Sequence, residues 1–136
     1  METIDKTYHM PFLPLQVYSA WVSSETVVPP ATQMDIDPVV GGHYRLIMKG
    51  EDHTAMNEGT FTTVEPGKRV VYSWEWNKDG EVTQIEVNFY PTDTGTAVHI
   101  LHSGFKTEEA AVAHDNGWDS YIKGLLAILE GEHPNH

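Results

Sequence analysis

The 136-residue chain contains no cysteine, little positive charge and no long apolar run. Without cysteine there can be no disulfide, no thiolate nucleophile and no thiolate metal site, so packing and hydrogen bonds must hold the fold together. Only 8 residues are Lys or Arg against 20 Asp or Glu, and the formal net charge is −12. This charge disfavours nucleic acid and anionic lipid as partners. No stretch is long enough to span a bilayer, so we expect no membrane insertion.

The remaining composition is that of a globular protein, with 40% hydrophobic and 21% charged residues. A chain of this length typically forms one domain, so we expect residues 1–136 to be a single unit. The first residues, Met1 to Lys6, lack the basic and apolar segments of a secretory signal, which predicts a cytoplasmic location.

Alternating apolar residues separated by turn residues predict an antiparallel sheet of about six or seven strands. The clearest alternation covers 83–89, where Thr83, Ile85, Val87 and Phe89 share one face. Turn signals occur at Pro66-Gly67, at 77–80 and at 91–95, where we expect the strand before Pro91 to close. The expected strands are 3–10, 33–37, 42–49, 56–64, 69–76, 83–89 and 96–103.

Helical spacing predicts a short helix over 13–23 and a long carboxy-terminal helix that ends near Gly131. Thr107 is a suitable cap for the second helix, and the glutamates that follow suit its positive end. One apolar stripe of this helix must cover the apolar face of the sheet, which indicates an α+β architecture. The stripe consists of Ala111, His114, Trp118, Ile122, Leu125 and Leu129.

Histidines are the first candidates for chemistry. His99 and His102 have a spacing seen in metal sites, but residues three apart on a strand point to opposite faces, so we expect no metal site. His102 and His114 could instead flank one polar spot in an apolar cavity. The alternatives are a structural hydrogen bond from His102 to the helix, and a solvent-facing His114 at the helix start.

Trp74 and Trp76 share a strand face with Tyr72, and this aromatic wall either lines a cavity or fills the core.

Other residue patterns argue against most catalytic chemistries. The strand carboxylates Glu75 and Glu86 are more typical of a solvated sheet face. The serines lack a nucleophile-elbow context, and no glycine loop leads into a helix to cradle phosphate. We therefore expect no cofactor and assign no catalytic residue.

Four segments in combination resemble the family related to the activator of the ninety-kilodalton heat-shock-protein ATPase, within the START and birch-pollen-allergen superfamily. The resemblance implies the helix-grip fold, in which a curved sheet wraps around a long carboxy-terminal helix. It also implies a cavity that in the superfamily holds lipids, sterols, polyketides or other hydrophobic molecules. The segments are Gly41-Gly42-His43-Tyr44, residues 65–74, residues 96–105 with His102-Ser103-Gly104-Phe105, and residues 114–118 with His114 and Gly117-Trp118.

Three functions follow as hypotheses. The first is binding of a small hydrophobic or amphipathic molecule between the sheet and the long helix. The second is a co-chaperone-like interaction module of the stress response, with a chaperone as partner. The resemblance implies that in eukaryotic co-chaperones an additional amino-terminal domain makes the main chaperone contact, and we expect this chain to correspond to the shared domain alone. The third is a cyclase or hydrolase that uses His102 or His114 as acid or base, for which no second catalytic group is found.

The binding hypothesis ranks first because aromatic residues concentrate on the elements that would line the cavity. Pairing of two copies through an exposed sheet face is considered only because symmetric dimers are common. The expected ligand-binding residues are Tyr44, Met48, Met56, Trp74, Trp76, His102, His114, Trp118 and Ile122.

Overall fold

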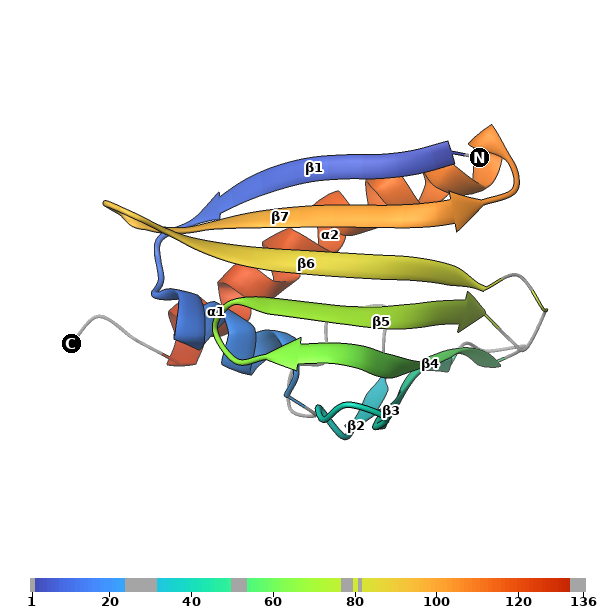
Figure 1. The fold of residues 1–136 in the computed structure, drawn as a ribbon, viewed down its shortest axis with the longest axis horizontal. Coiled ribbons are helices and arrows are strands. Elements are labelled where there is room, and N and C mark those ends of the chain that lie inside the picture. The colour runs from blue at the N-terminus through green and yellow to red at the C-terminus, as the bar shows by residue number, and fades with distance from the viewer. Residues whose placement is uncertain (1, 24–31, 50–53, 77–79, 81, 133–136) are drawn as a thin grey trace.

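A computed structural model describes residues 2–23, 32–49, 54–76, 80 and 82–132. Within this part of the chain, seven strands form one antiparallel sheet and two helices lie on one side of it (Figure 1). Neither helix in the described part is long and apolar enough to cross a membrane. The elements are β1 (Glu2–Met10), α1 (Pro14–Trp21), β2 (Gln33–Ile36), β3 (His43–Lys49), β4 (Thr54–Glu65), β5 (Arg69–Trp76), β6 (Thr83–Thr92), β7 (Gly95–Phe105) and α2 (Glu108–Glu132).

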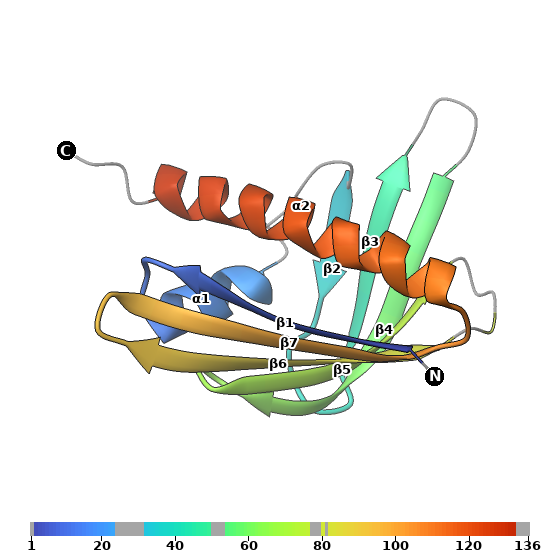
Figure 2. The same cartoon turned by 90° about the horizontal axis from the view of Figure 1, so that it is seen from above.

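The strands follow the order β1-β7-β6-β5-β4-β3-β2. Strands β2 to β7 are consecutive antiparallel neighbours, and β1 adds to the far side of β7. Figure 2 shows that the sheet curves and that α2 lies along its concave side. The predicted α+β helix-grip architecture is confirmed.

Strand register decides which residues face the helices. Ile4 pairs with His102, His102 with Ile85, Ile85 with Tyr72, and Tyr72 with Phe61. Directly opposed residues share a face of the sheet, and all five are buried. We call the face that carries these residues the concave face and the other the convex face.

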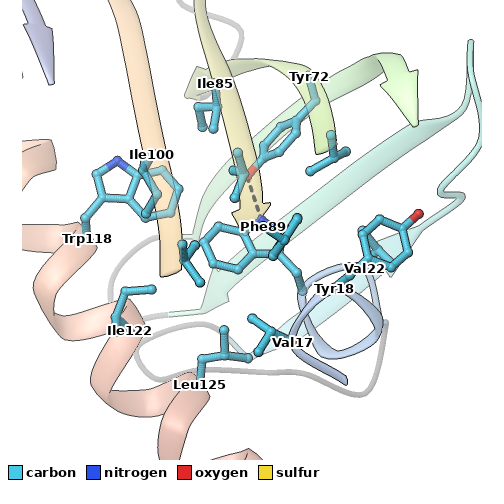
Figure 3. Close-up of a cluster of buried hydrophobic side chains, with 14 of the residues drawn as sticks. Val17, Tyr18, Val22, Tyr72, Ile85, Phe89, Ile100, Trp118, Ile122 and Leu125 are labelled. Carbon is cyan, nitrogen blue, oxygen red and sulfur yellow. Dashed lines mark hydrogen bonds between the residues drawn. The ribbon is translucent and has the colours of Figure 1, made fainter. Parts of the chain in front are cut away.

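The core lies between the concave face and the two helices (Figure 3). Trp21 from α1 donates a hydrogen bond from Nε1 to the Tyr72 hydroxyl at 3.1 Å, drawn as the dashed line. Its ring also meets Phe89 of β6 edge-on, with ring centroids 5.9 Å apart. Leu125 of α2 is fully buried in the same cluster. One aromatic residue of α1 thus joins the short helix to the middle of the sheet.

Helix α2 begins as the sequence predicts. The Thr107 hydroxyl accepts a hydrogen bond from the Ala110 backbone N–H at 3.1 Å, and Glu108 and Glu109 occupy the first turn. Five residues of the predicted stripe are buried and His114 is half-buried. The stripe therefore packs toward the sheet, as its spacing requires.

A polar clasp fixes α2 to the edge strand β1. Lys6 Nζ lies 2.6 Å from Asp119 Oδ1 and 3.0 Å from Asp115 Oδ1, and the Tyr8 hydroxyl donates to Asp119 Oδ1 at 2.6 Å. The hydrogen bond to Asp119 raises the pKa of Lys6, and the bond from Lys6 lowers the pKa of Asp119. Burial raises the pKa of Tyr8 to about 12. The clasp keeps Lys6 charged and occupied.

The turn predicted at Pro66-Gly67 is present, whereas the strand end predicted at Pro91 is not. Gly67 has φ +74°, the backbone region that glycine tolerates best, in the tight turn predicted between β4 and β5. The prediction that Pro91 closes its strand is wrong, because β6 continues to Thr92 and Pro91 pairs with Thr96. A proline is tolerated at a hairpin end where the ladder does not need its nitrogen. The turn predicted over 77–80 falls largely on 77–79, outside the described residues.

Candidate functional site

His102 of β7 is fully buried and joins the sheet to α2. Trp118 Nε1 lies 3.2 Å from His102 Nδ1, and Thr83 Oγ1 lies 2.7 Å from His102 Nε2. An indole can only donate, so Nδ1 accepts and Nε2 carries the imidazole proton toward Thr83. The Thr83 hydroxyl then donates to the Trp74 carbonyl at 3.3 Å. Both nitrogens of His102 are therefore occupied by protein partners.

The environment of His102 keeps its imidazole neutral. Burial, with a smaller contribution from the nearby His114, lowers the pKa of His102 to about 3. Of the two alternatives that the sequence left open, the geometry fits the structural hydrogen bond between strand and helix. An imidazole with both nitrogens occupied is poorly suited to act as a general acid or base.

His114 belongs to the first turns of α2 and lies beside His102 of β7. The two ring centroids are 5.4 Å apart, and the His114 ring also approaches Trp74 at 6.3 Å and Phe105 at 4.9 Å. Its Nδ1 is 2.8 Å from the carbonyl oxygen of Ala110, one turn earlier in the helix. The two histidines thus stand together among aromatic rings, and His114 faces the sheet instead of solvent.

Trp118 and Ile122 fill the core. The Trp118 ring stacks on Trp21 with centroids 5.8 Å apart and planes at 20°, and it lies 6.3 Å from Trp74. Both Trp118 and Ile122 are 7% exposed. Of the predicted aromatic wall on β5, Tyr72 is buried in the same core and Trp74 is half-buried. The side chain of Trp76 lies outside the described residues.

Apolar side chains at the β2–β4 end of the concave face are covered less completely. Leu46 pairs with Asn57, and Met48 pairs with Ala55, which places all four on the face that carries Tyr44. Leu46, Met48 and Ala55 are half-buried. Among the described residues, α2 packs chiefly on β1, β7 and α1, away from this end. The concave face thus retains an apolar surface beside Trp74 that the long helix leaves partly open.

Met56 does not join this surface. It pairs with Ile47, next to the Met48–Ala55 pair in the ladder, so its side chain belongs to the convex face. Met48 and Met56 were predicted to line one cavity, but the register separates them. The strand alternation that was visible in the sequence could have shown which of the two points inward only if the pairing partner had been known.

Asn57 is a residue that the sequence analysis missed. It is fully buried on the concave face, and the Tyr44 hydroxyl lies 2.9 Å from its Oδ1 and 2.7 Å from the Ser73 carbonyl oxygen. The other amide atom, Nδ2, is buried without a hydrogen-bond partner. The sequence alone contains no signal for it, because placing Met56 inward turns Asn57 outward, and only the pairing of β3 with β4 reverses this. Burial raises the pKa of the Tyr44 hydroxyl well above its usual value, so the phenol stays neutral.

Two further features lie away from this surface. A hollow of about 480 Å³ opens between α1 and the end of α2. The hollow is lined by Leu13, Leu15, Gln16, Ser19, Ala20, Ser23 and Leu129.

On the convex face, His99 Nε2 is 2.7 Å from Asp5 Oδ1. The described residues contain no group of three or more His, Asp or Glu that could hold a metal.

Known structures share this fold over nearly the whole chain. A protein of Mesorhizobium loti has a TM-score of 0.83 at 19% identity, over 99% of this chain and 100% of its own. A protein of unknown function from Staphylococcus aureus has a TM-score of 0.86 at 18% identity, over 98% and 96%. The AHSA1-like protein from Aeromonas hydrophila has a TM-score of 0.79 at 21% identity, over 99% and 96%. At these identities the likeness establishes the fold alone.

The sequence comparison gives the family. No curated protein matches the chain. The sequence profile described as Activator of Hsp90 ATPase homolog 1-like protein matches residues 12–130, which is most of the chain. The protein therefore belongs to the family of Activator of Hsp90 ATPase homolog 1-like proteins.

Proposed function

We propose that the protein binds a small hydrophobic or amphipathic molecule on the concave face, beside α2 at the β2–β4 end of the sheet. The observation that carries this proposal is the partly covered apolar surface made by Leu46, Met48 and Trp74 around the buried Asn57. Ligand sites in proteins are mostly apolar, with a few placed polar groups that fix orientation. The membership of a helix-grip family is in keeping with this use of the fold.

The expected affinity is moderate. Covering about 300 Å² of apolar ligand surface at roughly 25 cal/mol per Å² contributes about 7 kcal/mol before the entropy of association is subtracted. The methionine side chain is flexible and polarizable, so Met48 can adapt to ligands of different shape. We expect micromolar binding with modest selectivity among apolar skeletons.

A pair of substitutions on adjacent residues tests the location. Leu46→Trp adds bulk on the concave face, whereas Ile47→Trp adds the same bulk one residue later on the convex face. Both native residues are half-buried on the same strand, so Ile47→Trp is a matched control for Leu46→Trp. The assay is thermal unfolding with fatty acids, sterols, flavonoids and aromatic polyketides, each far above its dissociation constant.

A ligand at one hundred times its dissociation constant should stabilise the native and Ile47→Trp proteins by about 2.7 kcal/mol, a shift of several degrees. Leu46→Trp should abolish the shift, because the indole occupies the ligand's place. Equal shifts in both variants would place binding elsewhere, and no shift with any compound in the native protein would refute the proposal.

The hollow between α1 and α2 favours a second candidate, a protein-contact surface of the co-chaperone type. Leu13 is 65% exposed and Leu15 is 58% exposed at its rim. Clustered apolar side chains on a surface are typical of protein contacts. Stimulation of a purified ninety-kilodalton chaperone ATPase that is lost on Leu15→Asp, and retained on Val112→Asp at another exposed site, would support this candidate.

A further inference from the structure

The amide of Asn57 has one atom without a hydrogen-bond partner. The side chain is nevertheless fully buried. Buried polar groups in native proteins nearly always have a partner, since leaving one unpaired forfeits the hydrogen bonds that it had in water. An unpaired group of this kind on the face proposed to take a ligand marks a place where the ligand could supply the missing partner.

The single hydroxyl proton of Tyr44 determines which atom of the Asn57 amide has no hydrogen-bond partner. The Tyr44 oxygen lies within hydrogen-bond distance of both the Ser73 carbonyl and the amide of Asn57, but a phenol has one proton to donate. If the phenol donates to Ser73, its second contact is satisfied only when the NH₂ of Asn57 faces it. In the structure Oδ1 faces Tyr44 and Nδ2 is unpaired, but amide nitrogen and oxygen are assigned from the hydrogen-bond network, and exchanging the two satisfies both contacts of the phenol. The group left without a partner is then the amide oxygen, an acceptor.

The charges of the described residues disfavour an anionic ligand at this place. Lys6 is the lysine on the concave face, and it is held by Asp115 and Asp119. The two arginines of the sheet, Arg45 and Arg69, belong to the convex face, because Arg45 pairs with Glu58 and Arg69 bonds Glu86 beside it. The net charge of −12 adds a long-range repulsion. A carboxylate ligand would therefore meet an acceptor and no free cation among these residues.

The neighbours of Asn57 are apolar. Leu46 lies directly across from it on β3, Met48 lies diagonally across, and Trp74 belongs to the same face of β5. Because Asn57 is fully covered, a ligand must displace a side chain to reach it, and the unbranched Met48 is the neighbour that can move most easily.

We infer that the ligand is a neutral apolar molecule carrying a hydroxyl or another hydrogen-bond donor, which donates to the amide oxygen of Asn57. This inference rests on the proposed function and adds the class of ligand to it. Alcohols, phenols and hydroxylated ring systems fit, whereas fatty-acid anions do not.

Three matched probes test the inference: a naphthol, its methyl ether and the corresponding naphthoate. They share one apolar skeleton but present a donor, an acceptor without a donor, and an anion. Dissociation constants are measured by calorimetry at pH 7 for the native protein, Asn57→Leu and Asn88→Leu. Asn88 is a matched control because it is also buried but lies on the convex face, where its partner across the β6–β7 ladder is His99.

The native protein and Asn88→Leu should bind the naphthol about tenfold more tightly than the methyl ether, as one added hydrogen bond to a buried group allows, and the naphthoate most weakly. In Asn57→Leu the preference for naphthol should fall to about one, while the ether still binds, which shows that the variant is folded. Equal binding of naphthol and ether by the native protein, or tighter binding of the naphthoate, would overturn this inference and leave the binding function standing. Failure of all three probes to bind would overturn this inference, and together with the absence of a thermal shift for every compound of the wider panel it would overturn the proposed function as well.

Discussion

Acid sensitivity of the buried His102 offers a direct test of how the sheet and α2 are joined. The residue has a pKa of about 3 in the folded protein because burial disfavours its charged form. In the unfolded chain an exposed histidine has a pKa of about 6.5. Below that value the unfolded state takes up a proton that the folded state does not, so stability falls as the pH falls toward 3.

The size of this effect follows from the two pKa values. Each pH unit below about 6.5 costs about 1.4 kcal/mol, so lowering the pH from 7 to 5 should cost about 2 kcal/mol through His102 alone. His102→Gln removes the titration while offering an acceptor to Trp118 and a donor to Thr83. At pH 7 this variant should be less stable than the native protein, because the shorter amide cannot match the ring's packing, but it should lose about 2 kcal/mol less on acidification.

Urea unfolding at several pH values between 5 and 7 measures the difference, and the contributions of the other histidines cancel in the comparison. His99→Gln is the control, since it retains His102 and should retain the acid-dependent loss. If native protein and His102→Gln lose the same stability between pH 7 and pH 5, then His102 is not held as a buried neutral ring, and the hydrogen bond from Trp118 is wrongly assigned.

Two further substitutions test the packing of α2. Lys6→Met removes the ion pairs with Asp115 and Asp119 but keeps the Tyr8 hydrogen bond, and it should cost about 1 kcal/mol because the ion pairs are partly exposed; added salt should reduce the difference from the native protein in urea unfolding. Leu125→Ala should cost about 3 kcal/mol, because the side chain is fully buried, whereas Val112→Ala on the exposed side of the same helix should change the midpoint of unfolding little; equal effects of the two would contradict the orientation of α2.

The local pattern of the chain was sufficient for most of the fold. The alternation over 83–89 predicted β6, and the spacing from Ala111 to Leu129 predicted the buried stripe of α2, because both signals depend only on neighbours within the same element. The turn at Gly67 was likewise visible in two adjacent residues. The failure at Pro91 shows the limit of such rules, since whether a proline ends a strand depends on the partner strand.

The candidate site was only partly predictable. The sequence left open whether His102 and His114 lie together, and in the structure their rings are 5.4 Å apart. Whether a histidine serves a ligand or the fold depends on its hydrogen-bond partners, and Trp118 and Thr83 are distant from His102 in the sequence. Met48 and Met56 were both expected to line the cavity, but the pairing with Ile47 puts Met56 on the convex face.

The sequence by itself determined the class of the fold, the expected absence of thiol chemistry, the acidic surface and the residues available for a core. These properties follow from composition and from contacts between residues close in the chain. Only the tertiary structure decided that Asn57 is buried with one amide atom unpaired, that His102 is occupied by Trp118 and Thr83, and that Lys6 is held by two carboxylates. Each depends on strand register and on the docking of α2, which bring together residues up to 113 positions apart. No local pattern of residues encodes such a contact.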